Sequence, residues 1–266
     1  MSDKVSRQRD FVVADGHRLR VERLDPGSGV DGPWLVFLHE GLGSIPQWGE
    51  FPAALCAASG LPGLVYERWG FGESDRLVLP RPLDYLHQEA TRALPAVLDA
   101  CGIDACIPVG HSDGASIALL YAAHVPGQVR GVVSVAAHVV IEELTLSGIR
   151  DAGHAFYQGS LRERLARYHG DNTETMFRGW HETWLQPEFR HWQMLDRLPA
   201  IRCPVLAIQG EGDEYGTPGQ VDAIVRGVSG PVEGYMVPDC GHIPHRQQAD
   251  RVLAKITDFL RQLRED

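Results

Sequence analysis

Ser112 lies between two glycines in the stretch Gly110-His111-Ser112-Asp113-Gly114, where an apolar run gives way to a run of small residues. The apolar run 106–109 is typical of a buried parallel strand, and 115–123 is typical of a helix packed on a sheet. A sharp turn between them would expose the serine hydroxyl, and flanking glycines avoid the clash that a Cβ would cause there. The pattern therefore predicts that Ser112 is a nucleophile. The competing interpretation is a serine that only caps the helix.

The partners that a serine nucleophile needs follow it along the chain in a suitable order. A serine hydroxyl becomes reactive when a base takes its proton and an acid orients that base. Asp213 and His242 each come directly after a predicted strand, so they should reach the carboxyl edge of the sheet, where Ser112 also lies. We expect these three side chains to converge. Glu211 and Glu214 occupy the same loop as Asp213 and are the alternative acids.

The elements that must position these residues alternate between strand-like and helix-like segments. Such alternation predicts an α/β fold with a doubly wound, mostly parallel sheet and helices on both faces. An opening hairpin turns at Asp15-Gly16. The predicted strands are 10–14, 19–24, 33–39, 64–67, 106–109, 129–137, 204–210 and 232–237, and the predicted helices are 51–58, 84–100, 115–123, 219–227 and 247–263. His245 is expected at the start of the last of these helices.

The alternation stops between residues 141 and 198, where the sequence is helical and rich in large aromatic side chains. We therefore expect residues 1–140 and 199–266 to form the α/β core, with 141–198 inserted as a helical cap. The aromatics either bury a small core of their own or cover a pocket on the sheet, and both can hold. A lid over the pocket is the favoured interpretation.

Four separated motifs resemble those of the α/β-hydrolase-fold superfamily, and the resemblance covers nearly the whole chain. They are the loop His39-Glu40-Gly41-Leu42-Gly43, the loop 68–74, the turn at Ser112, and the late pair Asp213 and His242. The chain is similar to serine hydrolases with a helical cap, of the carboxylesterase kind. The resemblance implies a Ser112–His242–Asp213 triad that works without a metal or an organic cofactor.

The resemblance also implies an oxyanion hole built from two backbone N–H groups. One belongs to Asp113, directly after the nucleophile, and the other is assigned to Gly41 in the early loop. Many relatives have a glycine where this chain has Glu40, so the amides of Glu40 and Leu42 remain alternatives to Gly41. The carboxylates of Glu40 and Asp113 are unexpected near a developing negative charge. Arg68 is expected to organise its loop.

The chemistry that these residues favour is acyl transfer to water through an acyl-enzyme on Ser112. Hydrolysis of a carboxylic ester of a small molecule is the first expectation. Hydrolysis of a thioester, a lactone or a C–C bond by the same machinery is the alternative. A hypothesis of another class is a ligand-binding or signalling module that keeps the fold but has little turnover.

Composition limits the remaining classes of function and location. The chain has 266 residues, 44% of them hydrophobic, and a formal net charge of −10, which is unfavourable for binding nucleic acid. No apolar run is long enough to cross a bilayer. The polar stretch 1–10 lacks the apolar segment of a secretory signal, so a cytoplasmic location is expected. Five cysteines without C-x-x-C spacing indicate no metal cluster, and a homo-oligomer is possible.

Overall fold

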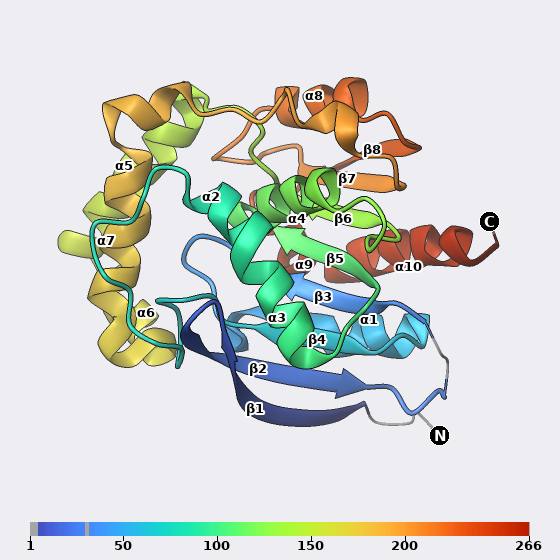
Figure 1. Cartoon of the computed structure of the whole chain (residues 1–266). Coiled ribbons are helices and arrows are strands. Elements are labelled where there is room, and N and C mark those ends of the chain that lie inside the picture. Colours follow the sequence, from blue (N-terminus) through green and yellow to red (C-terminus); the bar gives the residue numbers. More distant parts are fainter. Residues whose placement is uncertain (1–4, 30–31, 266) are drawn as a thin grey trace.

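A central eight-stranded sheet organises the computed structural model, which describes residues 5–29 and 32–265. The strand order is β1-β2-β4-β3-β5-β6-β7-β8 (Figure 1). The first two pairings, β1 with β2 and β2 with β4, are antiparallel, and the others are parallel. The predicted mostly parallel α/β sheet is therefore confirmed. The strands are β1 (Ser6–Ala14), β2 (His17–Asp25), β3 (Trp34–Leu38), β4 (Gly63–Tyr66), β5 (Cys106–His111), β6 (Val132–Val135), β7 (Val205–Gly210) and β8 (Val232–Val237).

Helices cover both faces of the sheet and bury two apolar clusters. The helices α1 (Phe51–Ser59) and α10 (Ala249–Glu265) pack together on one face. The other face carries α3 (Leu94–Cys101), α4 (Asp113–His124) and α8 (Gly219–Gly227). Alternate residues of β3 enter opposite clusters: Leu35 and Phe37 point to the α1 side, and Val36 and Leu38 to the α4 side. A sheet that is buried on both faces explains the nearly continuous apolar strands.

The long helix predicted over 84–100 is divided into three parts. They are α2 (Tyr85–Gln88), a π-helical turn η2 (Glu89–Ala93) and α3. Pro95 lies in the first turn of α3 and has no N–H to donate to the helical ladder. The wider turn lies immediately before this proline, which accounts for the irregularity.

Two other elements differ from the prediction at their ends. The strand expected over 129–137 is shorter, because β6 ends at Val135 and Ala136 adopts a left-handed φ of 54°. At the C-terminus, a short helix α9 (Pro244–Gln247) precedes α10, and it contains His245. The first turn expected for the closing helix is thus a separate element.

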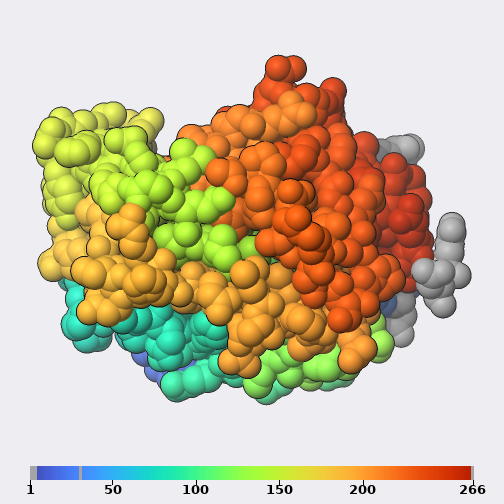
Figure 2. Space-filling model, turned by 90° about the horizontal axis from the view of Figure 1, so that it is seen from above, coloured from blue at the N-terminus to red at the C-terminus, as the bar shows by residue number. Residues whose placement is uncertain are grey.

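The segment between β6 and β7 contains three helices beyond the carboxyl ends of the strands (Figure 1). In the space-filling view from above, this segment and the C-terminal third of the chain share the visible face (Figure 2). Phe156 and Phe177 stack with ring centroids 3.7 Å apart, whereas Tyr157 is 56% exposed. The helices are α5 (Glu143–Tyr157), α6 (Leu161–His169) and α7 (Thr173–Trp184), and the short 3-10 turns of the chain are η1 (Pro46–Trp48), η3 (Gly170–Asn172), η4 (Pro187–His191) and η5 (Leu198–Ala200).

Among the described helices, none combines the length and the apolar character needed to cross a bilayer. Residues 1–4, which form part of the polar stretch that favoured a cytoplasmic location, lie outside the described residues.

Candidate active site

Ser112 occupies a strained turn between β5 and α4. Its φ of 53° lies in the left-handed region, which residues other than glycine rarely adopt. Its N–H donates to the Val135 carbonyl at 2.9 Å, which fixes the turn against the next strand. A Cβ on Gly110 would lie 2.2 Å from the Gly114 carbonyl oxygen, and one on Gly114 would lie 1.9 Å from that of Leu38. Both glycines are therefore required by the close approach of backbone on either side.

The structure brings Ser112, His242 and Asp213 into one chain of hydrogen bonds. The Ser112 Oγ and the His242 Nε2 are 2.9 Å apart, and the His242 Nδ1 lies 2.8 and 3.0 Å from the two Asp213 carboxylate oxygens. Each of the three residues is 8% exposed. The Ser112 side chain makes no hydrogen bond to the N-terminus of α4, so the helix-cap interpretation does not describe its contact.

The acid and the base reach this point from the ends of neighbouring strands. Asp213 follows β7, and its Oδ1 also accepts the Tyr215 N–H at 2.8 Å. Burial alone would raise the pKa of the Asp213 carboxyl, but its contacts with His242 and the Tyr215 amide outweigh burial and lower it. A lowered pKa keeps this carboxylate ionised and able to hold the imidazole. Gly210 allows the two loops to approach, because a Cβ there would lie 2.2 Å from the Gly241 carbonyl oxygen.

Among the described residues, the two alternative acids, Glu211 and Glu214, form no hydrogen bond with the imidazole of His242. The Glu214 Oε2 accepts the backbone N–H of His242 at 3.1 Å, so this side chain braces the loop and not the imidazole. Glu211 is exposed. On the other side, His111 donates from Nε2 to the His242 carbonyl at 2.7 Å. The loop that carries His242 is thus held from two directions.

Gly41 and Asp113 line the same cavity as Ser112, and among the described residues neither backbone amide donates a turn or loop hydrogen bond. The Leu42 amide, one of the alternatives, donates to the Glu40 Oε2 at 2.9 Å and is therefore occupied. A Cβ on Gly41 would lie 2.3 Å from the Trp180 Nε1, so only a glycine fits under this indole. This geometry favours Gly41 over Leu42 as the second donor, although Glu40 remains an alternative.

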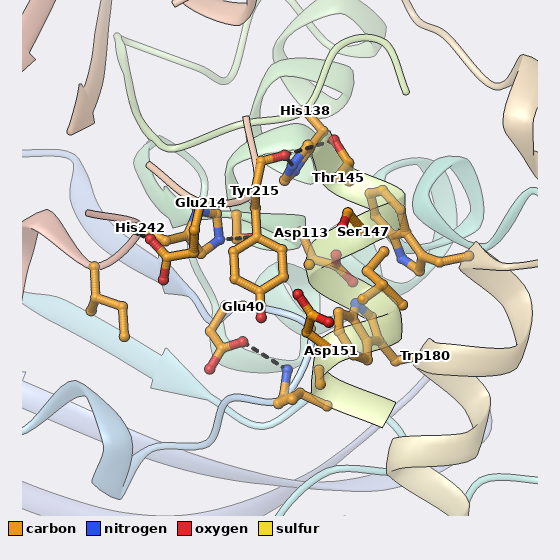
Figure 3. A pocket seen from close by; sticks show the side chains of 18 of the residues that line it. Glu40, Asp113, His138, Thr145, Ser147, Asp151, Trp180, Glu214, Tyr215 and His242 are labelled. Atoms are coloured by element: carbon orange, nitrogen blue, oxygen red, sulfur yellow. Dashed lines mark hydrogen bonds between the residues drawn. The ribbon is translucent and has the colours of Figure 1, made fainter. Parts of the chain in front are cut away.

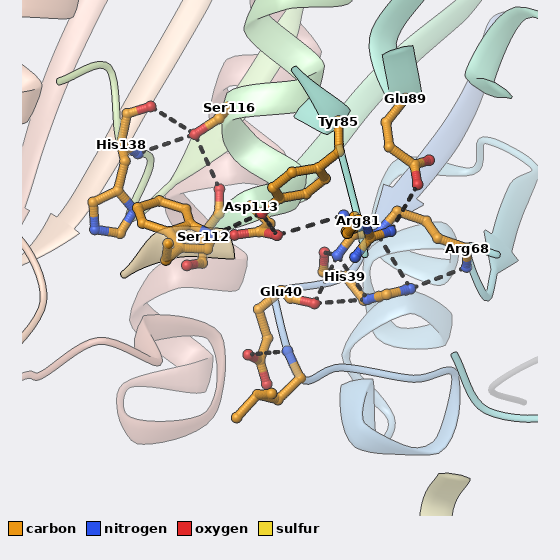
Figure 4. Close-up of polar contacts among 12 residues, drawn as sticks. His39, Glu40, Arg68, Arg81, Tyr85, Glu89, Ser112, Asp113, Ser116 and His138 are labelled. Carbon is orange, nitrogen blue, oxygen red and sulfur yellow. Dashed lines mark hydrogen bonds and ion pairs between the residues drawn. The ribbon is translucent and has the colours of Figure 1, made fainter. Parts of the chain in front are cut away.

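The carboxylate of Asp113 belongs to a buried polar network behind the turn (Figure 4). The Tyr85 hydroxyl donates to its Oδ2 at 2.6 Å and in turn accepts from the Trp184 Nε1 at 2.7 Å. The Arg68 Nη1 lies 3.6 Å from the same carboxylate oxygen. This network, which sequence reasoning missed, accounts for a carboxylate beside the expected oxyanion hole.

A cavity of about 560 Å³ lies over Ser112, between the sheet edge and the helices of 141–198 (Figure 3). Tyr215, another residue that sequence reasoning missed, packs on His242 with ring centroids 4.6 Å apart and extends toward Glu40. Burial raises the pKa of the Glu40 carboxyl, despite its hydrogen bond from Leu42. Ser112 and His242 line this cavity, and the other polar or aromatic lining residues are Glu40, His111, Asp113, His138, Thr145, Ser147, Asp151, Arg164, Trp180, Trp184, Glu214 and Tyr215.

Buried histidines beside this site are expected to make the folding stability sensitive to acid. Burial, aided by the charges of Arg246 and His242, lowers the pKa of His245 to about 3. The folded protein therefore binds fewer protons than the unfolded chain as the pH falls below about 6.5, so stability is lost from there downward by up to about 1.4 kcal/mol per pH unit. We expect His245→Gln to flatten the fall of unfolding free energy between pH 6 and 4.5, measured by urea unfolding. His124→Gln, at an exposed histidine, is the control and should leave the slope unchanged. An equal slope in all three proteins would contradict this assignment.

No group of three or more histidine, cysteine or acidic side chains within the described ranges is arranged to hold a metal ion.

Two features define the α/β-hydrolase class: a doubly wound sheet, and a serine at a sharp strand-to-helix turn that meets a histidine and an acid from the ends of later strands. This chain has both. The chain belongs to the alpha/beta hydrolase family, whose family model matches residues 35–255. A sequence search of the curated proteins found no match.

Solved structures of several hydrolases share this fold. Proline iminopeptidase of Mycobacterium smegmatis is 22% identical, with a TM-score of 0.73 over 96% of this chain and 98% of that one. A thermophilic esterase of Thermogutta terrifontis is 19% identical, with a TM-score of 0.70 over 96% and 99%. The enol-lactonase of Burkholderia xenovorans is 19% identical, with a TM-score of 0.71 over 94% and 99%. At these identities the likeness concerns the fold alone.

Proposed function

We propose that this protein is a serine hydrolase that cleaves a carboxylic ester of a small molecule through an acyl-enzyme on Ser112. The observation that carries the proposal is the hydrogen-bonded chain from the Ser112 Oγ through His242 to Asp213, at the floor of a cavity large enough for a small substrate. A binding module has no need of this alignment. The esterase and lactonase of the same fold make ester bonds the first class to test.

The proposed reaction has two halves. In the first, the His242 Nε2 takes the Ser112 proton while the Oγ bonds to the substrate carbonyl carbon, and the amides of Gly41 and Asp113 stabilise the resulting oxyanion. The carbonyl re-forms as the C–O bond to the alcohol breaks, and His242 returns the proton to the alcohol. In the second half, His242 deprotonates a water that attacks the acyl carbon. The bond from that carbon to the Ser112 Oγ then breaks, His242 returns the proton to the Oγ, and the acid product is released.

A panel of p-nitrophenyl esters of increasing acyl length, together with labelling by a fluorophosphonate, tests the proposal. We expect nitrophenol release above the buffer rate and a single phosphonate adduct that peptide mass spectrometry locates on Ser112. Absence of both turnover and labelling would favour the ligand-binding alternative. Lactones, thioesters and a vinylogous diketone added to the panel would show whether the protein cleaves one of the alternative bonds instead.

We propose further that α5–α7 act as a lid and that the cavity disfavours anionic acyl groups. Its lining includes Glu40, Asp151 and Glu214, against the single guanidinium of Arg164. An acyl chain that ends in a carboxylate would meet like charges in a partly dry space, which costs binding energy.

At pH 8, p-nitrophenyl hydrogen succinate should therefore show a kcat/KM about tenfold below that of the butyrate ester, at a cost of about 1.4 kcal/mol. Glu40→Gln removes the most buried of the three charges and keeps an oxygen for the Leu42 amide. It should therefore reduce the difference in kcat/KM between the two esters. Asp151→Asn is the control, because Asp151 is exposed and its charge is screened by water. Equal rates for both esters in the unmodified protein would contradict the charge argument.

A cytoplasmic location remains part of the proposal. All five cysteines are free thiols, as expected in a reducing compartment.

A further inference from the structure

Arg68 connects the two loops that carry the expected oxyanion donors (Figure 4). We propose that Arg68 is a positioning residue for catalysis: it orients and polarises the peptide that ends in the Gly41 N–H, and it neutralises the carboxylate of Asp113, the other donor residue. This inference rests on the proposed hydrolytic function, because the donors matter only if an oxyanion forms.

The first half of the inference concerns the peptide between Glu40 and Gly41. The Arg68 Nη2 donates to the Glu40 carbonyl at 2.9 Å and to the His39 carbonyl at 3.2 Å. The Glu40 carbonyl and the Gly41 N–H belong to the same planar peptide unit. A cation that holds the oxygen therefore sets the direction of the N–H and makes it a stronger donor, because linked hydrogen bonds polarise one another.

Neighbouring contacts support this orientation. The Glu40 carbonyl also accepts the Gly43 N–H at 3.1 Å and contacts the His39 Nδ1 at 2.8 Å. The Arg68 amide donates to the other nitrogen of the same imidazole, Nε2, at 3.1 Å. Burial and the nearby charge of Arg68 lower the pKa of His39 well below its usual value, so this ring remains neutral and its Nδ1 carries the proton. The peptide oxygen is thus held by several donors, of which Arg68 is the charged one.

The second half of the inference concerns Asp113. Asp113 lines the cavity beside Ser112, and its carboxylate accepts the Tyr85 hydroxyl in the network behind the turn. A negative charge there would oppose the negative oxygen that forms on the substrate. The Arg68 Nη1 lies 3.6 Å from the Asp113 Oδ2, and both side chains are 1% exposed, so water screens the attraction little. That Nη1 makes no hydrogen bond with any described residue, which leaves Asp113 as its counter-charge.

A nearby arginine provides a matched comparison. Arg81 is also buried, at 4% exposed, and its Nη2 donates to the Glu89 carboxylate at 3.2 Å. No hydrogen bond among the described residues joins Arg81 to Glu40 or Asp113. Removing either guanidinium leaves a buried carboxylate without its cation, so both changes should affect stability. Arg68 contacts the Asp113 carboxylate and the Glu40 carbonyl directly, whereas Arg81 reaches this network only through the ring of Tyr85, over which its guanidinium lies at 4.4 Å. The loss of Arg68 should therefore disturb the oxyanion donors far more than the loss of Arg81.

The test compares Arg68→Met, Arg68→Lys, the double variant Arg68→Met/Asp113→Asn, and Arg81→Met, with kcat and KM measured for p-nitrophenyl butyrate. Arg68→Met should lower kcat about 10- to 100-fold, somewhat less than the loss of a whole oxyanion donor, and leave KM within about twofold. The kcat of Arg68→Lys should lie between those of Arg68→Met and the unmodified protein, because one ammonium does not reach both loops as a guanidinium does. The double variant should recover several-fold over Arg68→Met, since it removes the uncompensated charge. Arg81→Met should stay within about threefold of the unmodified protein.

Thermal unfolding of each variant separates stability from positioning. If Arg68→Met does not fold, the test rests on the kcat of the charge-neutral double variant and of Arg68→Lys, each compared with that of the unmodified protein. A kcat for Arg68→Met or Arg68→Lys equal to that of the unmodified protein, an equal loss in Arg81→Met, or no recovery in the double variant would overturn the inference while the hydrolase stands. An unmodified protein without turnover would instead overturn the proposed function itself.

Discussion

Ser112→Ala is expected to reduce kcat for a p-nitrophenyl ester on the order of 10⁵- to 10⁶-fold, as removal of the nucleophile does in other serine hydrolases. The physical reason is that no other hydroxyl stands 2.9 Å from the His242 Nε2 in the described structure. Steady-state nitrophenol release, checked by single-turnover kinetics at high enzyme concentration, measures the loss.

Ser147→Ala is the matched control for this variant, because Ser147 lines the same cavity but is exposed. It should remain within about threefold of the unmodified protein, as expected for a surface change. Loss of phosphonate labelling should accompany Ser112→Ala and not Ser147→Ala. A Ser112→Ala protein that keeps more than about a hundredth of the rate would show that another group performs the attack.

Asp213→Asn should lower kcat about 10⁴-fold with the fold intact. The carboxylate contacts the His242 Nδ1 through both of its oxygens, which requires the proton on Nδ1 and leaves Nε2 free to accept the serine proton. An asparagine amide that donates to Nδ1 reverses this tautomer, so the base is lost although its position is kept. The same ester assay measures the effect, and circular dichroism verifies the fold.

Glu214→Gln distinguishes the two neighbouring acids. Within the described residues, the Glu214 carboxylate accepts a hydrogen bond from the backbone N–H of His242 alone, and glutamine keeps an oxygen for that contact. We expect a loss of less than about fivefold, close to the range of a neutral surface change. A loss at Glu214 larger than the loss at Asp213 would reassign the acid.

Local patterns predicted the fold well because most of its determinants are local. The apolar runs correspond to strands that are buried on both faces, and the glycines around Ser112 reflect contacts that any sharp strand-to-helix turn must make. The prediction was wrong at Ala136, where an apolar residue leaves the strand through a left-handed conformation that hydropathy does not reveal. The division of the helix before β5 had a visible signal in Pro95, which the periodicity argument did not weigh.

The site was predictable to the extent that chain order and strand ends determine it. The position of Ser112, Asp213 and His242 after three strands placed them at one edge of the sheet. The environment of Asp113 was not predictable in this way, because its partners Tyr85 and Arg68 come from loops and helices far away in the sequence. Such contacts depend on tertiary packing, which no local spacing encodes.

The shared network behind the turn has a consequence for protein engineering. Asp113, Arg68 and Tyr85 form one electrostatic unit, and Trp184 extends it into α7. Substitutions at these positions should therefore show strong epistasis: a neutral residue at 113 is tolerated only when residue 68 also changes, and neither is tolerated alone. A combinatorial library that varies residue 113 alone would therefore discard viable sequences. A library that varies residues 113 and 68 together would retain them.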